Sequence, residues 1–249
     1  MSFPSFALSV TGSPAGLTAP SGPAEAWKSK VAVAVQAAYK ADPVREPVGV
    51  TITFRLSPDR YRDTAIFNLL KATIDGVSAV LFDAVPAGPR QRWSYEDWWI
   101  VALSAKKAIA DGEPTVNLEI GSPNDHGASA VATPAADIDI PGSPPLWPGD
   151  ARGQARVLQW REFAVERLAS VRQSFRRDAK IGLHFGFRIE QSRLRTSDLD
   201  NFCIPAAQAV SYSLFGDGRR ANILELAATK QVARPDSDVG TRVRVWVLE

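Results

Sequence analysis

Two aspartates separated by one residue, Asp198 and Asp200, have the spacing in this chain that most directly suggests chemistry. In an extended segment both side chains would point to one face, within reach of a single ion. Two carboxylates held that close repel each other unless a cation lies between them. Mg²⁺ suits the pair because it prefers oxygen ligands and is commonly held by one or two carboxylates, with water and substrate phosphate. Such an ion activates water and stabilises charge during phosphodiester cleavage.

The same motif also has an ordinary structural interpretation, because aspartate often caps a helix or turns a loop. Neighbouring arginines favour the functional one. Arg193 and Arg195 precede the acids, and Arg219 and Arg220 follow the next expected helix, as phosphate binding would require. Solvent-exposed arginines with no ligand are the alternative for these four positions.

The element that carries the acids occurs twice in the chain. An offset of 133 residues aligns Arg62 with Arg195 and Asn68 with Asn201. Further identities at this offset are Phe54 with Phe187, Arg55 with Arg188, Val77 with Val210, Ser78 with Ser211, Leu81 with Leu214 and Phe82 with Phe215. In the first copy the positions of the two acids hold Ala65 and Phe67. A repeat can serve core packing alone, but packing does not require an acidic pair.

Each copy is expected to contain a short strand ending in a Gly-Ser-Pro turn, a helix, a strand, a second helix and two closing strands. Residues 26–41 and 155–175 are the first helices, and 48–56 and 180–189 are central strands rich in β-branched and aromatic residues. Residues 115–120 and 241–248 alternate as half-buried strands do. The sequence therefore predicts an α+β protein with two similar units, residues 1–120 and 135–249, joined by a linker over 121–134 that is rich in small and polar residues.

Composition is that of an ordinary globular protein, with 45% hydrophobic and 22% charged residues and a net charge of +2. The charge is too small to demand a nucleic-acid partner. A single cysteine, Cys203, excludes an intrachain disulfide and a Cys-rich zinc site. Neither a signal peptide nor an apolar run of about 20 residues is found, so we expect a cytoplasmic protein with no membrane partner.

The residues around the acids resemble a known family. Asp198, Leu199, Asp200 and Asn201, followed by a helix and by Asp217, are similar to the motif of the RusA family of Holliday-junction resolvases. The resemblance implies small α+β subunits that act as homodimers and cut four-way DNA with Mg²⁺ or Mn²⁺. It also implies catalytic and metal-binding roles for Asp198, Asp200 and Asp217.

The first copy resembles the family in a complementary way. Lys71 stands at the family's lysine position, where the second copy has Ile204, and Asp97 stands at the place of the later aspartate. Whether Asp97 or Asp217 completes the metal site is left open by the sequence. No copy has the whole set, so the resemblance implies a fused pseudo-dimer, each unit a small mixed sheet with two helices, whose first half has lost its metal site.

Two functions remain as expectations. The first is a Mg²⁺-dependent, structure-selective endonuclease on branched DNA with a single active site, to which Lys71 contributes across the interface between units. The second is a catalytically inactive module of the same fold that binds DNA or a protein. Trp98 and Trp99, in a first-copy segment about ten residues longer than its counterpart, are interpreted either as base-stacking residues or as interface packing.

Overall fold

The computed structural model describes residues 3–16, 21–85, 94–126, 133–145, 151–176, 178–216, 222–235 and 238–248. Its helices are α1 (Ser21–Ala38), α2 (Pro58–Asp63), α3 (Ile66–Leu81), α4 (Ala151–Leu168) and α5 (Leu199–Phe215), with short 3-10 turns η1 (Asp97–Trp99), η2 (Pro123–His126), η3 (Ala169–Ser174) and η4 (Gln191–Arg193). The strands are β1 (Phe6–Thr11), β2 (Val48–Leu56), β3 (Ala84–Val85), β4 (Ser94–Tyr95), β5 (Ile100–Ile109), β6 (Thr115–Gly121), β7 (Ala136–Pro141), β8 (Lys180–Ile189), β9 (Ile223–Val232) and β10 (Gly240–Leu248).

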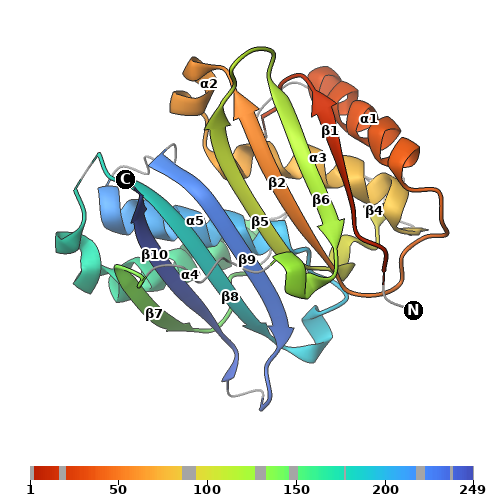
Figure 1. Cartoon of the computed structure of the whole chain (residues 1–249). Helices are drawn as coiled ribbons and strands as arrows, with labels where there is room; N and C mark the ends of the chain where they lie inside the picture. Colours follow the sequence, from red (N-terminus) through yellow and green to blue (C-terminus); the bar gives the residue numbers. More distant parts are fainter. Residues whose placement is uncertain are drawn as a thin grey trace.

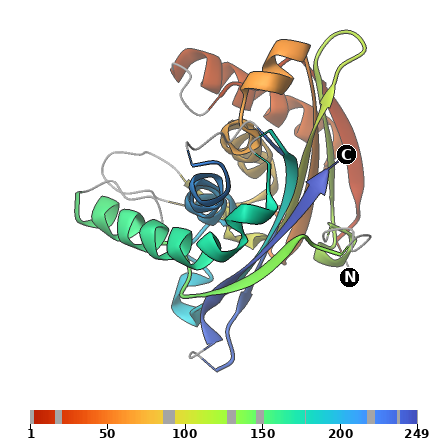
Figure 2. The same ribbon diagram turned by 90° about the vertical axis from the view of Figure 1, so that its left-hand side faces the viewer.

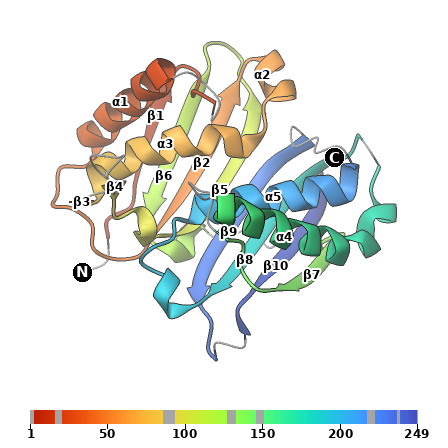
Figure 3. The same ribbon diagram turned by 180° about the vertical axis from the view of Figure 1, so that it is seen from behind.

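Eight of these strands form one mixed sheet in the order β1-β6-β2-β5-β9-β8-β10-β7, and β3 pairs with β4 separately. The four long helices α1, α3, α4 and α5 all lie on one face of the sheet. Figure 1 views the sheet from the face without long helices, and Figure 3 views it from the helical face. Turned by 90°, the molecule shows two layers, a curved sheet and the helices packed against it (Figure 2). The protein is therefore an α+β fold, as expected.

The core lies between these layers because the strands alternate. Ile52, Phe54 and Leu56 of β2 are fully buried, whereas Thr51 and Thr53, which alternate with them, are partly exposed on the other face. In β8, Phe185 and Phe187 are fully buried in the same way. Inside the helical layer, α1 packs on α3, α4 packs on α5, and α3 contacts α5. This last contact brings the first turns of two helices from distant parts of the sequence into one region.

The pairings on the two sides of the sheet's centre correspond one to one. β1 is antiparallel to β6 as β7 is to β10, and β2 is parallel to β5 as β8 is to β9. Both parallel pairs shift register after their first residue, at Val48 and at Ile181, which are 133 positions apart. Between the two sets, β5 and β9 pair antiparallel.

Three expectations differ from the structure. Instead of two small sheets there is one continuous sheet, because β5 and β9 join by backbone hydrogen bonds. The segment before α3 forms the short helix α2 in place of a loop, so the described part of residues 1–120 contains three α-helices and not two. The predicted linker begins with the ordered turn η2, where the buried His126 ring lies against Gly49 and its Nδ1 is 2.9 Å from Thr51 Oγ1.

Candidate functional site

The acidic motif lies at the start of α5. Asp198 is the residue before the helix, in extended conformation, but its side chain makes no capping hydrogen bond to the backbone. It accepts a hydrogen bond from the Asn201 side-chain amide instead, at 2.9 Å. Asp200 is already in the first helical turn, so the two acids are not on an extended segment as assumed from the sequence. Helix capping therefore does not explain why an aspartate stands at either position.

Asp200 is the more deeply buried of the pair, with only 3% of its surface exposed. Neither of its carboxylate oxygens has a hydrogen bond of normal geometry to the described residues. Burial raises its pKa, while the nearby Lys71 ammonium acts in the opposite direction. A buried carboxylate without hydrogen bonds is costly, so its oxygens mark a place where a further ligand would be accommodated.

Two residues of the first copy face this motif. Lys71, on α3, places its Nζ 3.6 Å from Asp200 Oδ2. Asp97, in η1, is 7% exposed and hydrogen-bonded to Asp198. Asp97 and Asp200 also line a narrow enclosed space whose other walls are Ile74, Ile100, Leu103 and Leu199. The structure thus brings Asp97, and not only Lys71, to the acids of the second copy.

The ionisation of these groups follows from burial and mutual charge. Burial raises the pKa of Asp97 to about 9, and the negative charge of Asp198 adds to the shift, so Asp97 is protonated at neutral pH and donates to Asp198. Burial lowers the pKa of Lys71, but four carboxylates, led by Asp200, outweigh it and the net pKa is raised. Lys71 is therefore a permanent cation and not a proton acceptor.

A second lysine borders the site from β9. Lys230 is 4% exposed, and its Nζ donates to the backbone carbonyl of Ser197 at 2.7 Å, which anchors the residue before the acidic motif. Burial lowers the pKa of Lys230 to about 8, although Asp198, Asp97 and Asp200 act in the opposite direction. Its ammonium thus adds positive charge close to the acids at neutral pH.

Behind Lys71 lies a small network of charges. Asp75, one turn further along α3, pairs with Lys71 at 3.0 Å and with Lys28 of α1 at 2.9 Å. At the 133-residue offset these three positions hold Gln208, Ile204 and Arg161 in the second copy. The network exists only on the side whose lysine faces the acids, which indicates that it positions Lys71.

The donor set fits a hard dication. Asp97, Asp198 and Asp200 supply carboxylate oxygens, the ligands that Mg²⁺ and Mn²⁺ prefer, and Asp200 has oxygens without hydrogen bonds. As the side chains stand, however, no group of three or more His, Cys, Asp or Glu among the described residues has metal-ligating geometry. In the described arrangement the hydrogen bond from Asp97 to Asp198 and the Lys71–Asp200 ion pair offset the charge instead.

The predicted phosphate-binding arginines have different surroundings. Arg193 donates to Ser143 Oγ and to the Pro144 carbonyl, and lies 4.8 Å from the Phe202 ring, so its guanidinium holds the Gly-Ser-Pro turn. Arg195 is exposed, and its guanidinium lies 5.5 Å from the Trp98 ring. Arg219, Arg220 and Asp217 lie outside the described residues.

The corresponding region of the first copy has no such chemistry. Ala65 and Phe67 are 6% and 1% exposed and belong to the hydrophobic core. Lys107 of β5, the counterpart of Lys230, donates to the carbonyls of Thr64 and Tyr61 at 2.8 and 2.7 Å. The lysine anchor of the turn is thus present in both copies, whereas the acids are present in one.

Sequence reasoning had identified Asp198, Asp200 and Lys71, and had left Asp97 as one of two alternatives. It did not assign roles to Lys230, Asp75 and Lys28. Lys107 and Lys230 correspond when the segment of about ten extra residues in the first copy is allowed for, and a buried lysine retained at the same place in both copies indicates a common contact.

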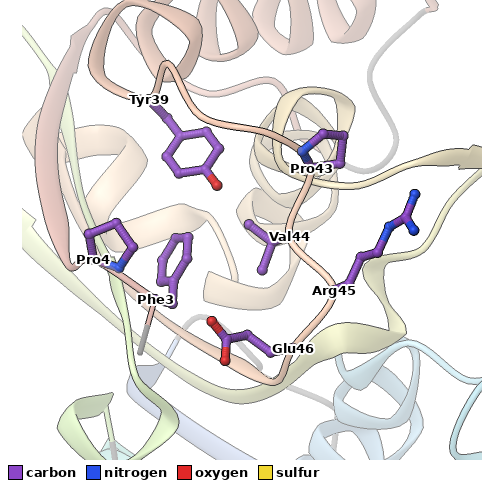
Figure 4. Close-up of a pocket in the computed structure, with 7 residues that line it drawn as sticks. All are labelled: Phe3, Pro4, Tyr39, Pro43, Val44, Arg45 and Glu46. Carbon is purple, nitrogen blue, oxygen red and sulfur yellow. The ribbon is translucent and has the colours of Figure 1, made fainter. Parts of the chain in front are cut away.

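A separate concavity of about 360 Å³ lies in the first copy, between the start of β1 and the α1–β2 connection (Figure 4). Its lining residues are Phe3, Pro4, Tyr39, Pro43, Val44, Arg45 and Glu46. Tyr39 donates its hydroxyl to the Asp42 carbonyl, and Arg45 pairs with Asp83 at 2.9 Å. None of the acidic-site residues lines it.

Comparison with known proteins adds little. No protein-family profile and no curated protein matches the chain. A solved structure of cyanuric acid hydrolase, described as an evolutionary innovation by structural concatenation, is 13% identical and covers 98% of this chain and 70% of that one, with a TM-score of 0.26. A similarity of that size carries no argument about fold or function. Within the described helices, none combines the length and apolarity needed to cross a bilayer.

Proposed function

We propose that the protein is a Mg²⁺- or Mn²⁺-dependent endonuclease that cuts branched DNA at a single site formed by Asp97, Asp198, Asp200 and Lys71. The observation that carries the proposal is the convergence of buried charge from both copies. Lys71 and Asp97 meet Asp198 and Asp200 across the β5–β9 junction, where apolar packing would need none of them. The RusA-like sequence motif supplies the substrate class.

The proposal includes an intrachain pseudo-dimer, and several repeated contacts support it. The sheet has equivalent strands in the same order from either edge, because β1-β6-β2-β5 of the first copy corresponds to β7-β10-β8-β9 of the second. Arg60 donates to Ser13 as Arg193 donates to Ser143, and Lys107 donates to the Thr64 carbonyl as Lys230 donates to that of Ser197. Contacts that recur between equivalent elements of the two copies are the expected result of two units packed edge to edge. The units are residues 1–120 and 135–249.

Each side chain has a distinct part in the proposed reaction. A dication held by Asp198, Asp200 and Asp97 would supply an activated water and would stabilise charge on the phosphate. Asp97 would have to lose its proton to solvent to join that ligand set, because a carboxylic acid must ionise to bind a metal. Lys71, fixed by Asp75, provides a positive charge for the phosphate next to the acids.

The test is cleavage of a four-way junction with each strand labelled separately. Asp200→Asn should remove Mg²⁺-dependent cleavage, while Asp63→Asn, an exposed acid before α3, should leave it unchanged. Because Ala65 and Phe67 offer no side-chain oxygen, one chain should nick a single strand and not resolve the junction symmetrically. Paired cuts by a monomer would contradict the single-site proposal.

The alternative is a binding module without catalysis. One observation favours it: the Lys71–Asp200 ion pair and the Asp97–Asp198 hydrogen bond already offset the acidic charge without a cation. Binding to branched DNA with no cut on any strand in Mg²⁺ or Mn²⁺ would establish this alternative.

A further inference from the structure

Next to the acids lies an aromatic ring, that of Trp98, which is not part of the hydrophobic core. Trp98 and Trp99 are stacked, with ring centroids 3.8 Å apart and planes at 29°. Both side chains are partly buried, but Trp99 packs against the hydrophobic core and its Nε1 is buried, whereas Trp98 lies outside the core cluster. Trp99 therefore anchors a platform on which Trp98 is held in a fixed orientation.

The second component of the platform comes from the other copy. The guanidinium of Arg195 lies 5.5 Å from the Trp98 ring centroid, within the range of a cation–π contact. Arg195 is exposed and makes no ion pair with a carboxylate in the described parts of the chain. Its counterpart at the 133-residue offset, Arg62, pairs with Asp59 at 2.7 Å and with Asp63 at 3.2 Å. Arg195 thus has the charge of Arg62 without its acidic partners.

Both residues are adjacent in sequence to the acidic site. Trp98 follows Asp97 directly, and Arg195 is three residues before Asp198. An indole ring offers a surface for a nucleobase, and a guanidinium offers a planar fork of donors for a phosphate. A site that combines the two within a few residues of the acids fits a nucleotide of the strand to be cut.

We propose that Trp98 and Arg195 form a nucleotide-binding subsite beside the acidic site, with a nucleobase stacked on Trp98 and its phosphate paired with Arg195. This inference rests on the proposed function, because it assumes a DNA substrate. Only an unpaired base is available for stacking on protein, since a base inside a duplex is stacked on its neighbours. The subsite therefore selects DNA with unpaired nucleotides at the branch point over plain duplex.

The test is binding in EDTA, where no cleavage occurs, of a fluorescent branched DNA with unpaired nucleotides and of a duplex of equal length. Trp98→Ala should weaken binding to the branched DNA about 10-fold, with little change for the duplex, and Trp98→Phe should retain most of the preference. The matched control is Tyr212→Ala, because Tyr212 is also exposed and contacts an arginine, Arg161, at 4.9 Å. It lies near the end of α5 opposite to the acids.

Arg195→Ala should lower the slope of log affinity against log salt by about one unit, as expected for one lost phosphate contact. Arg62→Ala is its control and should leave the slope unchanged. Abasic sites placed one at a time at the branch then locate the stacked nucleotide. At that nucleotide, loss of the base should weaken DNA binding by the wild type as much as Trp98→Ala does. It should not weaken DNA binding by the Trp98→Ala variant any further.

The outcomes separate this inference from the proposed function. Cleavage of branched DNA with an unchanged binding preference in Trp98→Ala would overturn the subsite and leave the endonuclease proposal standing. A Trp98-dependent preference in EDTA without cleavage in Mg²⁺ or Mn²⁺ would support the subsite and overturn the endonuclease. Equal binding of branched and duplex DNA by the wild type would overturn the subsite.

Discussion

The first turns of α3 and α5 occupy the same place in the repeat but have opposite chemistry. In α3 the relevant positions are Ala65 and Phe67, which are core residues, and in α5 they are Asp198 and Asp200. Lysine shows the reverse pattern, with Lys71 on α3 and Ile204 on α5. Since α3 and α5 pack together, the two incomplete sets combine into one site. In the proposed pseudo-dimer, each copy needs to retain only the site residues that the other copy lacks.

The largest expected effect tests whether the acids are needed at all. Asp198→Asn combined with Asp200→Asn should lower cleavage of branched DNA at least about 1000-fold, because the charge that would bind the dication is lost. DNA affinity should stay the same or increase, since two negative charges near phosphate are removed. Single-turnover cleavage and binding in EDTA measure the two effects. Equal cleavage by the wild type and the double variant would end the proposal.

The second prediction compares the stability of variants at the matched positions 67 and 200. Phe67→Ala should destabilise the protein by about 3–5 kcal/mol, the usual result of emptying a buried aromatic site. Asp200→Asn should cost less than this without metal, because asparagine keeps the volume of the side chain and Lys71 retains its ion pair with Asp75. Urea unfolding of both variants gives the comparison. A large loss in Asp200→Asn would mean that the acid serves the fold.

The third prediction concerns pH and Asp97. The folded protein holds a proton on Asp97 up to a pKa of about 9, whereas the unfolded chain releases it near about pH 4. Stability without metal should therefore decline as pH rises through this window, by up to about 1.4 kcal/mol per unit from this group. Lys230, with its pKa lowered to about 8, contributes the opposite slope, but only above that pH.

Unfolding measurements between about pH 5.5 and 7.5 separate the contribution of Asp97 to the pH dependence of stability from that of Lys230. Asp97→Asn has no proton to lose and should show a smaller decline than the wild type over this range. Identical pH dependence of the two proteins would show that Asp97 is ionised in the folded state.

The smallest effect on cleavage is expected from Asp75, which pairs with Lys71. Asp75→Asn should lower cleavage about 10- to 100-fold by releasing Lys71, in the range typical of groups that orient a functional side chain. The binding of DNA in EDTA should change little, which separates a positioning role from a general structural one. Gln208→Ala, at the matched position of the second copy, is the control and should cleave normally. A Gln208 variant as impaired as Asp75→Asn would contradict an asymmetric network.

The sequence alone determined the local elements and the list of candidate residues. Strand alternation and helical periodicity are properties of neighbouring residues, so β2, β8, α3 and α5 were predictable, and the offset of 133 exposed the repeat. The acidic pair and Lys71 were visible as residue types at defined positions. Arg193 shows the limit of such reasoning, because its charge suggested phosphate while its contacts are with Ser143 and Pro144.

Only the tertiary structure decided which of these residues meet. Pairing of β5 with β9 makes one sheet of two expected ones, and packing of α3 on α5 places Lys71 3.6 Å from Asp200 although 129 positions (200 − 71) separate them in the chain. The hydrogen bond between Asp97 and Asp198 likewise joins residues far apart in the sequence, whereas Asp217, the alternative to Asp97, lies outside the described residues. Contacts of this kind depend on sheet order and helix packing, which are set by the burial of many apolar side chains at once and not by any local pattern.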